Sequence, residues 1–246
     1  MIAPIVWVGV AAVALLSFAT EGAIGFGGTV LAASVGAQLV PLDVLLPAFV
    51  ILNLVLSSWL LGRGRDAIAW RVLGRDVAPP VATGAAVGLA LFHLPGQAWL
   101  ILAFSAFVIG LAVFQLVKPA AGELSRAPRI ALLVLGGIAH GLFGTGGPMI
   151  VYVVRRRLPD KRAFRATLAV LWLVLNTALV INFASAGLYV APVDTTVIVL
   201  AVTIVPGLVL GDVIHHKLDA PRFERAVWLL LLAAGLALGI RTAVSL

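Results

Sequence analysis

The sequence predicts an all-α polytopic membrane protein made of two inverted-topology repeats, each a glycine-broken helical hairpin followed by three transmembrane helices. Three observations predict this fold class: an extreme apolar composition, glycine-rich interruptions at corresponding places, and an uneven distribution of basic residues. Hydrophobic residues occupy 62% of the 246 positions and charged residues 11%, with a mean hydropathy of +1.16. A soluble domain of this length could not hide so much apolar surface, so the lipid bilayer is the expected partner.

Charge and cysteine content exclude several classes of protein. The 17 basic and 10 acidic residues give a formal charge of +7. The basic residues lie between long apolar runs rather than on a solvated face, so no nucleic acid is expected as a partner. The absence of cysteine removes disulfides, iron–sulfur clusters and thiol nucleophiles. The serine-hydrolase, zinc-protease and phosphate-loop motifs are also missing from the sequence, so no enzyme, cofactor or metal site is expected.

Six apolar runs are long enough to cross the hydrocarbon core, which takes about 20 residues. They are residues 44–62, 77–93, 97–117, 166–186, 194–214 and 225–244. Two further apolar stretches, 2–40 and 130–154, contain glycine-rich interruptions at 22–28 and 141–148 that should break their helices. We expect the pieces that flank Gly144 to be too short to span. Each broken stretch should then form a re-entrant hairpin that enters and leaves on one face.

The two halves align as an internal duplication. Pairs that correspond at a shift of 119 positions are Gly25 and Gly144, Gly27 and Gly146, and Gly28 and Gly147. Pairs at a shift of 123 are Asn53 and Asn176, Gly84 and Gly207, and Gly88 and Gly211. Shifts that differ so little require only short insertions. We therefore expect a first repeat at 1–117, a cytoplasmic linker at 118–129 and a second repeat at 130–246, within one membrane domain.

Basic residues predict that the two halves point in opposite directions. The connection 155–165 carries six Lys and Arg residues and its counterpart 41–43 none, whereas 63–75 carries four and its counterpart 187–194 none. Because cytoplasmic loops collect positive charge, equivalent loops should face opposite sides. With three spans after each hairpin, 16 of the 17 basic residues lie inside and both termini outside. Five crossings per half would fit the charges equally well, and a cleavable signal peptide at 1–22 is a competing interpretation.

The glycine breaks are the expected substrate site. Irregular backbone inside a bilayer lines a cavity or is buried in protein, and paired breaks in inverted halves point to a midplane site. Helices that restart after Gly28 and Gly147 would direct unpaired N–H groups at an anion. The candidate substrate-binding residues are Gly25, Phe26, Gly27, Gly28, Thr29, Asn53, Gly144, Thr145, Gly146, Gly147 and Asn176. The alternatives are close helix packing for the glycines and interhelical hydrogen bonding for the asparagines.

Ionisable residues inside a membrane are functional candidates by default. Glu21 and His140 correspond at the shift of 119 and are the candidates for proton coupling. The alternative for Glu21 is a water-exposed helix end. Three glycine pairs with four-residue spacing are instead expected to pack helices together. They are Gly84 with Gly88, Gly207 with Gly211, and Gly235 with Gly239.

Residues 136–148 (GGIAHGLFGTGGP), followed by FRAT at 164–167 and by Asn176, resemble the second half of the TauE/SafE family of sulfite exporters and related anion permeases. The segment EGAIGFGG at 21–28 is similar to the first-half motif of that family. The resemblance covers essentially the whole chain. It implies transport of small sulfur-containing or carboxylate anions such as sulfite, thiosulfate, sulfonates or organic acids. Many members carry a cysteine near the motifs, and its absence here excludes thiol-dependent handling of the substrate.

The leading hypothesis is a secondary transporter in the cytoplasmic (inner) membrane that moves a small anion by alternating access, with protons as the candidate coupling ion. One alternative is an anion channel, because the same amide-lined breaks could form a selectivity filter. Another is an accessory membrane subunit without a substrate of its own. Uphill accumulation of the anion would separate a transporter from a channel.

Overall fold

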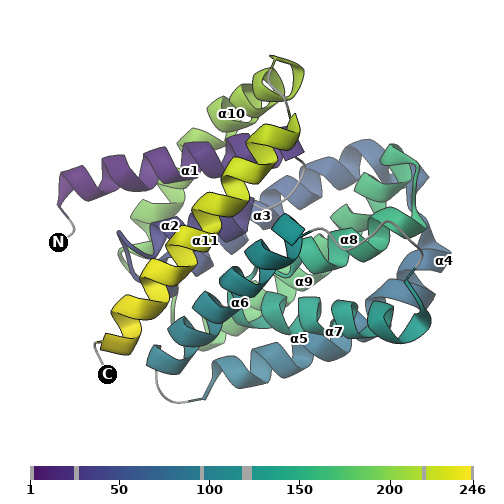
Figure 1. Cartoon of the computed structure of the whole chain (residues 1–246), viewed down its shortest axis with the longest axis horizontal. Helices are drawn as coiled ribbons and strands as arrows, with labels where there is room; N and C mark the ends of the chain where they lie inside the picture. Colours follow the sequence, from purple (N-terminus) through teal and green to yellow (C-terminus); the bar gives the residue numbers. More distant parts are fainter. Residues whose placement is uncertain (1–2, 25–27, 95–96, 118–123, 218–219, 245–246) are drawn as a thin grey trace. The chain divides into compact units, whose positions relative to one another are not determined.

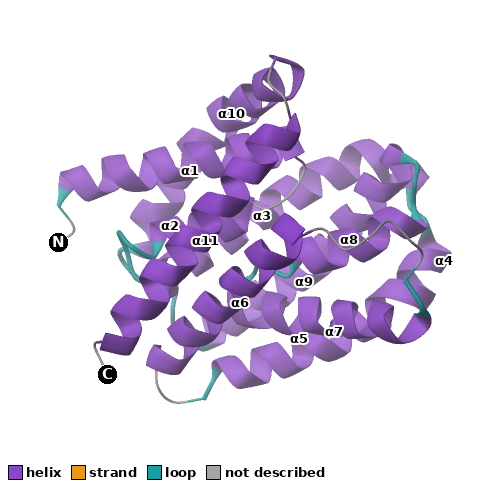
Figure 2. Ribbon diagram, viewed as in Figure 1, coloured by secondary structure: helices purple, strands orange, loops and turns teal. Residues whose placement is uncertain are grey.

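The computed structural model describes residues 3–24, 28–94, 97–117, 124–217 and 220–244, and all regular structure in these ranges is helical (Figure 2). Seven of the helices are long enough and apolar enough to cross a membrane. This confirms the all-helical, polytopic fold class that the composition predicts.

The helices form two compact units, and each unit contains helices from both halves of the chain. Unit 1 comprises Met1–Phe49, Pro95–Ala120 and Val190–Leu246, and unit 2 comprises Val50–Leu94 and Ala121–Tyr189. The helices of unit 1 are α1 (Pro4–Ile24), α2 (Gly28–Gly36), the start of α3 (Leu42–Gly64), α6 (Gln97–Val117), α10 (Val193–Lys217) and α11 (Ala220–Val244). Unit 2 holds the rest of α3, η1 (Arg65–Ala67), α4 (Trp70–Val72), η2 (Leu73–Val77), α5 (Ala78–Phe92), α7 (Arg126–Phe143), α8 (Gly147–Arg157) and α9 (Lys161–Ser185) (Figure 1).

Five of the six predicted spans coincide with long apolar helices, namely α3, α6, α9, α10 and α11. The sixth, at 77–93, is α5, which has only 15 residues but continues from α4 and the π-helical turn η2. Helices α1 and α7 also have the length of a span. The expectation that both pieces flanking Gly144 are too short is therefore wrong for α7, which has 18 residues. It holds for α8, which has 11.

Each unit contains one closely packed helix pair that includes a glycine-broken stretch. In unit 1, α1 packs along α10, and in unit 2, α7 packs along α5 (Figure 1). A Cβ atom on Gly84 or Gly88 of α5 would overlap the carbonyl oxygen of Val134 or Ile138 in α7. A Cβ on Gly207 of α10 would lie 2.5 Å from the Cβ of Phe18. Glycine is therefore required for the backbones to approach this closely, as the four-residue spacing predicts.

The α6–α11 pair of unit 1 packs in the same way. A Cβ atom on Gly235 would lie 3.2 Å from Cγ1 of Val108, and one on Gly239 would lie 3.3 Å from the Cβ of Ser105. The hydroxyl of Ser105 donates to the carbonyl of Ile101, 2.8 Å away and one turn earlier, so it leaves no buried donor at this contact. This glycine pair therefore also serves packing.

Both broken stretches double back on themselves. A Cβ on Gly136 of α7 would lie 2.8 Å from Cγ1 of Ile150 in α8, so the two helices run side by side away from the break. In the first half, a Cβ on Gly9 of α1 would lie 3.1 Å from Cδ1 of Leu39, which follows α2. The chain therefore reverses direction between α1 and α2 and again between α7 and α8.

The segment around η2, the start of α7 and the end of α8 all carry basic residues, and they meet at one end of unit 2. Asp76 of η2 forms an ion pair with Arg157 at the end of α8. The Arg157 guanidinium holds the pKa of Asp76 below its ordinary value of 3.8, and the charges of Arg129 and Arg75 lower it further. Because Arg129 belongs to the first turns of α7, the outer ends of α7 and α8 lie at the same end of unit 2.

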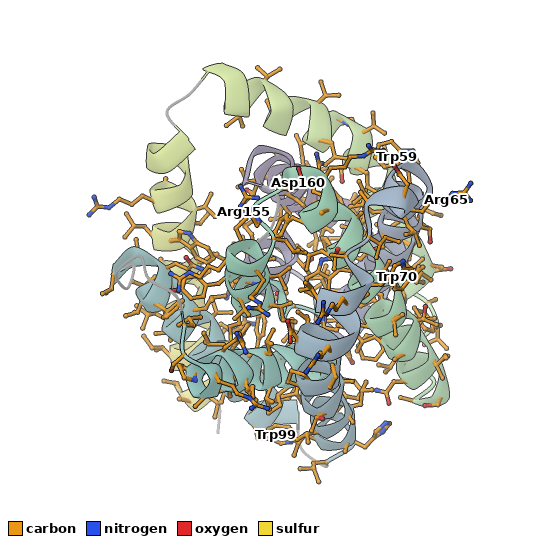
Figure 3. All side chains as sticks on the ribbon, turned by 90° about the vertical axis from the view of Figure 1, so that its right-hand side faces the viewer. Trp59, Arg65, Trp70, Trp99, Arg155 and Asp160 are labelled. Atoms are coloured by element: carbon orange, nitrogen blue, oxygen red, sulfur yellow. The ribbon has the colours of Figure 1, made fainter. Side chains whose placement is uncertain are left out.

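The start of α9 is tied to the same end. Arg162 pairs with Asp66 of η1 at 2.7 Å, and the N–H of Ala69 donates to the hydroxyl of Thr167 at 3.0 Å. The basic segments 63–75 and 155–165 therefore lie together at this end of unit 2. Figure 3 labels Arg155 and Asp160 of the second segment, together with the exposed Trp59, which precedes the first segment, and the exposed Trp70, which lies within it. Exposed tryptophans beside a basic loop are typical of a membrane–water interface.

Candidate functional site

The break between α7 and α8 is a sharp turn at Gly144. Helix α7 ends at Phe143, and Gly144 adopts a left-handed conformation with φ of +64°, which favours glycine over residues with a Cβ. Its N–H donates to the carbonyl of His140 at 2.8 Å and so closes the last turn of α7. Helix α8 restarts at Gly147 with Pro148 in its first turn, where the missing N–H costs nothing.

The close approach of the start of α8 to α7 requires a second glycine at this break, Gly146. A Cβ atom on Gly146 would overlap the carbonyl oxygen of Gly136 in α7 and lie 3.0 Å from the Cβ of His140. The start of α8 is therefore pressed against the last turns of α7. In the first turn of α8, Pro148 has no N–H and the N–H of Ile150 donates to the carbonyl of Gly146 at 3.4 Å, so helix geometry leaves the N–H groups of Gly147 and Met149 without an acceptor inside the helix.

Three predicted residues of the second half come together around the break. His140, Thr145 and Asn176 are 3%, 3% and 2% exposed. Both ring nitrogens of His140, Oγ1 of Thr145 and Oδ1 of Asn176 lack a hydrogen-bond partner within the described part of the chain. Buried polar atoms almost always have partners in folded proteins. Four such atoms on three side chains therefore mark the break between α7 and α8 as the candidate site.

Helix α9 brings Asn176 to this site. Trp172 of α9 reaches to 4.0 Å from a Cβ placed on Gly147, and Leu179 reaches to 3.7 Å from one placed on Gly144. Residues 172, 176 and 179 share one face of a helix, so Asn176 lies between these two contacts and faces the break. The amide of Asn176 lies next to the imidazole of His140, but the distance and angle between their polar atoms do not meet the geometry of a hydrogen bond.

Trp172 is the site residue that sequence reasoning missed. Its indole ring stacks on the imidazole of His140, with ring centroids 5.5 Å apart and an angle of 17° between the planes. This stacking fixes the orientation of the imidazole and covers one of its faces. The signal that could have identified Trp172 is its position four residues before Asn176, on the same helical face.

The parts of unit 2 that are seen to contact the site carry no charge. They include 50–53 of α3, 84–89 of α5, 144–151, and 167–181 of α9, and their sequences contain no acidic or basic residue. The site therefore offers hydrogen-bond donors and helix-end dipoles, without a fixed countercharge. The part of the chain with assigned positions also contains no cluster of His, Cys, Asp and Glu able to hold a metal ion.

The first break is described only on its two sides. The predicted site residues Gly25, Phe26 and Gly27 lie outside the described residues. Gly28 opens α2, and a Cβ placed on it would lie 2.5 Å from the carbonyl oxygen of Ser17 and 2.7 Å from Oε2 of Glu21. The carboxyl group of Glu21 is therefore at the first residue of α2, and Thr29, partly buried, follows it.

Asn53 lies near the second break. A Cβ on Gly144 would be 3.1 Å from Cγ2 of Val50 in α3, and Asn53 is one turn further along α3 on the same face. Asn53 is partly buried and belongs to unit 2. The structure thus groups Asn53 with His140, Thr145 and Asn176, and it places Glu21, Gly28 and Thr29 in unit 1.

Comparison with known proteins identifies the class of protein that carries this site. Residues 10–238 match the family described as sulfite exporter TauE/SafE. Over 174 residues the chain is 28% identical to the "Probable inner membrane transporter protein TsaS" of Comamonas testosteroni, which covers 70% of this chain and 72% of that protein. No solved structure matches the chain.

Proposed function

Because the chain belongs to the sulfite exporter TauE/SafE family, a family of membrane transporters and not of enzymes, we propose that it is a secondary transporter that moves a small anion by alternating access. The substrate class is a sulfur-containing anion or a small organic acid. The name of its relative, a probable inner membrane transporter, supports placement in the inner membrane. The distribution of basic residues among the loops favours an orientation with both termini outside.

The observation that carries this proposal is the group of buried, unpartnered polar atoms of His140, Thr145 and Asn176. An isolated polar atom buried without a partner costs about 1–3 kcal/mol, so a ligand that pairs with these atoms would recover this cost. The start of α8 directs further N–H donors at the same place. Neutral donors hold an anion less tightly than a fixed cation would, and release of the substrate requires weak binding.

Matching helix contacts support the duplication. A Cβ on Gly84 of α5 meets the carbonyl oxygen of Val134 and the nitrogen of Ile138 in α7. A Cβ on the corresponding Gly207 of α10 meets the same two backbone atoms of Leu15 and Ala19 in α1. Leu15 and Ala19 correspond to Val134 and Ile138 at the shift of 119 found for the glycine motifs. The same contact is thus formed twice, each time between a broken helix of one half and a span of the other.

The outer ends of α7 and α8 support a re-entrant hairpin in the second half. Arg129 and Arg157 both act on Asp76, so this stretch begins and ends at one end of unit 2. Three full crossings then remain in each half, and an odd number gives the halves opposite orientations. Five crossings per half would require α8 to span with 11 residues, or about 17 Å of helix, which is well short of the hydrocarbon thickness.

Transport by purified protein tests the function. Reconstituted proteoliposomes are loaded and assayed with radiolabelled sulfite, thiosulfate, methanesulfonate and short carboxylates at two pH values. Accumulation of one of them against its gradient, driven by a pH or sodium gradient, is expected. Downhill flux alone would indicate an anion channel. Absence of both flux and ligand-induced thermal stabilisation would indicate an accessory subunit.

A further inference from the structure

The unpartnered atoms at the second break include acceptors as well as donors. The hydroxyl of Thr145 and the N–H groups at the start of α8 can donate to a ligand. Oδ1 of Asn176 can only accept. A simple anion would satisfy the donors and leave such an acceptor without a partner.

His140 adds a second acceptor. Neither ring nitrogen has a partner within the described residues, and the segments 84–89, 144–151 and 167–181 that surround the ring contain no acidic or basic side chain. A buried imidazole with no carboxylate beside it is neutral, and a neutral imidazole has one N–H and one bare nitrogen. Trp172 stacks on a face of the ring, and this contact engages neither of the two nitrogens.

The helix ends that meet at the break also supply both hydrogen-bond donors and acceptors. The last carbonyl oxygens of α7 and the first N–H groups of α8 meet there, because one helix ends and the other begins within a few residues. The Gly144 N–H satisfies the carbonyl of His140. The remaining carbonyls of the last turn are further acceptors at the mouth of the turn.

We propose that the second break binds a monovalent oxoanion that carries its own O–H group, and that it discriminates against the same anion after that proton is lost. The negative oxygens accept from Thr145 and from the start of α8, and the O–H donates to Asn176 or to the bare nitrogen of His140. A fully deprotonated anion cannot donate, so it would face these acceptors lone pair to lone pair. This inference rests on the proposed function, because it specifies the form of the anion at the proposed site.

Methylphosphonate and methanesulfonate form a matched pair of probes. At about pH 6 each is mainly a monoanion with three oxygens and a methyl group, and only methylphosphonate carries an O–H. The dissociation constants of both for the purified full chain are measured by calorimetry at about pH 6 and about pH 9. We expect methylphosphonate to bind about tenfold more tightly than methanesulfonate at the lower pH, a difference of about 1.4 kcal/mol, and to lose this advantage at the higher pH.

Two further measurements keep the result decisive. Sulfite is titrated at the same two pH values, so the outcome does not depend on whether a methyl group fits, and hydrogen sulfite should bind more tightly than the dianion. His140→Phe keeps a ring on Trp172 but removes both nitrogens, and it should reduce the preference for the O–H probe. Thr177→Ala is the matched control, since the Thr177 hydroxyl donates to the Leu173 carbonyl at 2.7 Å and is exposed.

Equal affinity for the two methyl probes at about pH 6, or equal binding of sulfite at both pH values, would overturn this inference. That result would leave the transport function standing, because anions would still bind and move. The transport function fails separately, if no anion of the uptake panel crosses the membrane.

Discussion

The two glycine breaks occupy corresponding positions in the sequence, but different side chains face them. At the second break the imidazole of His140 stacks on Trp172, and neutral polar atoms without partners surround it. At the first, the carboxyl group of Glu21 lies beside Gly28 at the start of α2. The position equivalent to Trp172 is Phe49, which stacks on Phe18 with ring centroids 5.8 Å apart. Corresponding glycine motifs are thus accompanied by side chains of different chemical character.

Because the side chains differ, the two breaks are suited to different tasks, namely anion binding and proton transfer. A carboxylate at the start of α2 repels an anion and competes with it for the helix dipole, so the anion is expected at the second break. A carboxyl group that is close to a helix end and partly buried is suited to take up and release a proton. The second break is therefore the proposed anion site, and Glu21 stays a candidate for proton coupling.

The largest effect is expected at the backbone of the second break. Gly146→Val adds a branched side chain where a single Cβ already overlaps the carbonyl oxygen of Gly136, so the start of α8 must move and transport should be abolished. Uptake is measured beside the amount of protein in the membrane fraction, which should be unchanged. Gly62→Val is the control, since a Cβ on Gly62 has no atom within 4 Å. Gly27→Val makes the same change at the first break, and normal flux in both variants would refute the role of the glycine backbone.

Removal of the amide of Asn176 should weaken binding without blocking the cycle. Asn176→Ala deletes a side chain that is 2% exposed and faces the break, and loss of one neutral hydrogen bond to the substrate should raise the apparent KM up to about tenfold. Asn53→Ala should have a smaller effect, about twofold, because Asn53 is one turn away from the contact with Gly144. Initial rates over a range of substrate concentrations measure both, with Thr177→Ala as the control. If KM is unchanged in both variants, the asparagines serve packing alone.

The role of Glu21 is tested by the pH dependence of transport. Glu21→Gln keeps the shape of the side chain but cannot lose a proton, so uptake of methanesulfonate, which has no O–H of its own to titrate, should no longer respond to an imposed pH gradient. His140→Gln, at the equivalent position of the second break, should change affinity while the pH response persists. Rates with and without the gradient, for both variants and the parent protein, give the comparison. A full pH response in Glu21→Gln would assign the coupling to another group.

Sequence reasoning predicted the helices and the position of the second break because each has a local signal. Apolar runs of about 20 residues and the GTGGP turn at 144–148 are visible without any tertiary information. The length of α7 was missed because its first turn is basic and amphipathic, so the apolar run appears to begin only at Ile130. Trp172 was missed because a tryptophan in an apolar span has no distinguishing pattern of its own. The grouping of Asn53 with the second break depends on long-range packing, which the alignment of the halves does not contain.

The smallest effect is expected at the outer end of the second hairpin. Asp76 pairs with Arg157 there, whereas the sequence before residue 43 has Glu21 as its only charged side chain, so the first hairpin has no equivalent tie. Asp76→Asn should lower the free energy of unfolding by about 0.2–1 kcal/mol, because the pair is partly exposed and screened by solvent. The folded-state pKa of Asp76 is lowered, so this contribution is present above the ordinary value of 3.8 and is lost as the pH falls through the lowered pKa. Thermal unfolding in detergent should therefore separate the variant from the parent at neutral pH and give converging midpoints in acid. A difference that persists in acid would mean that Asp76 acts through packing and not through its charge.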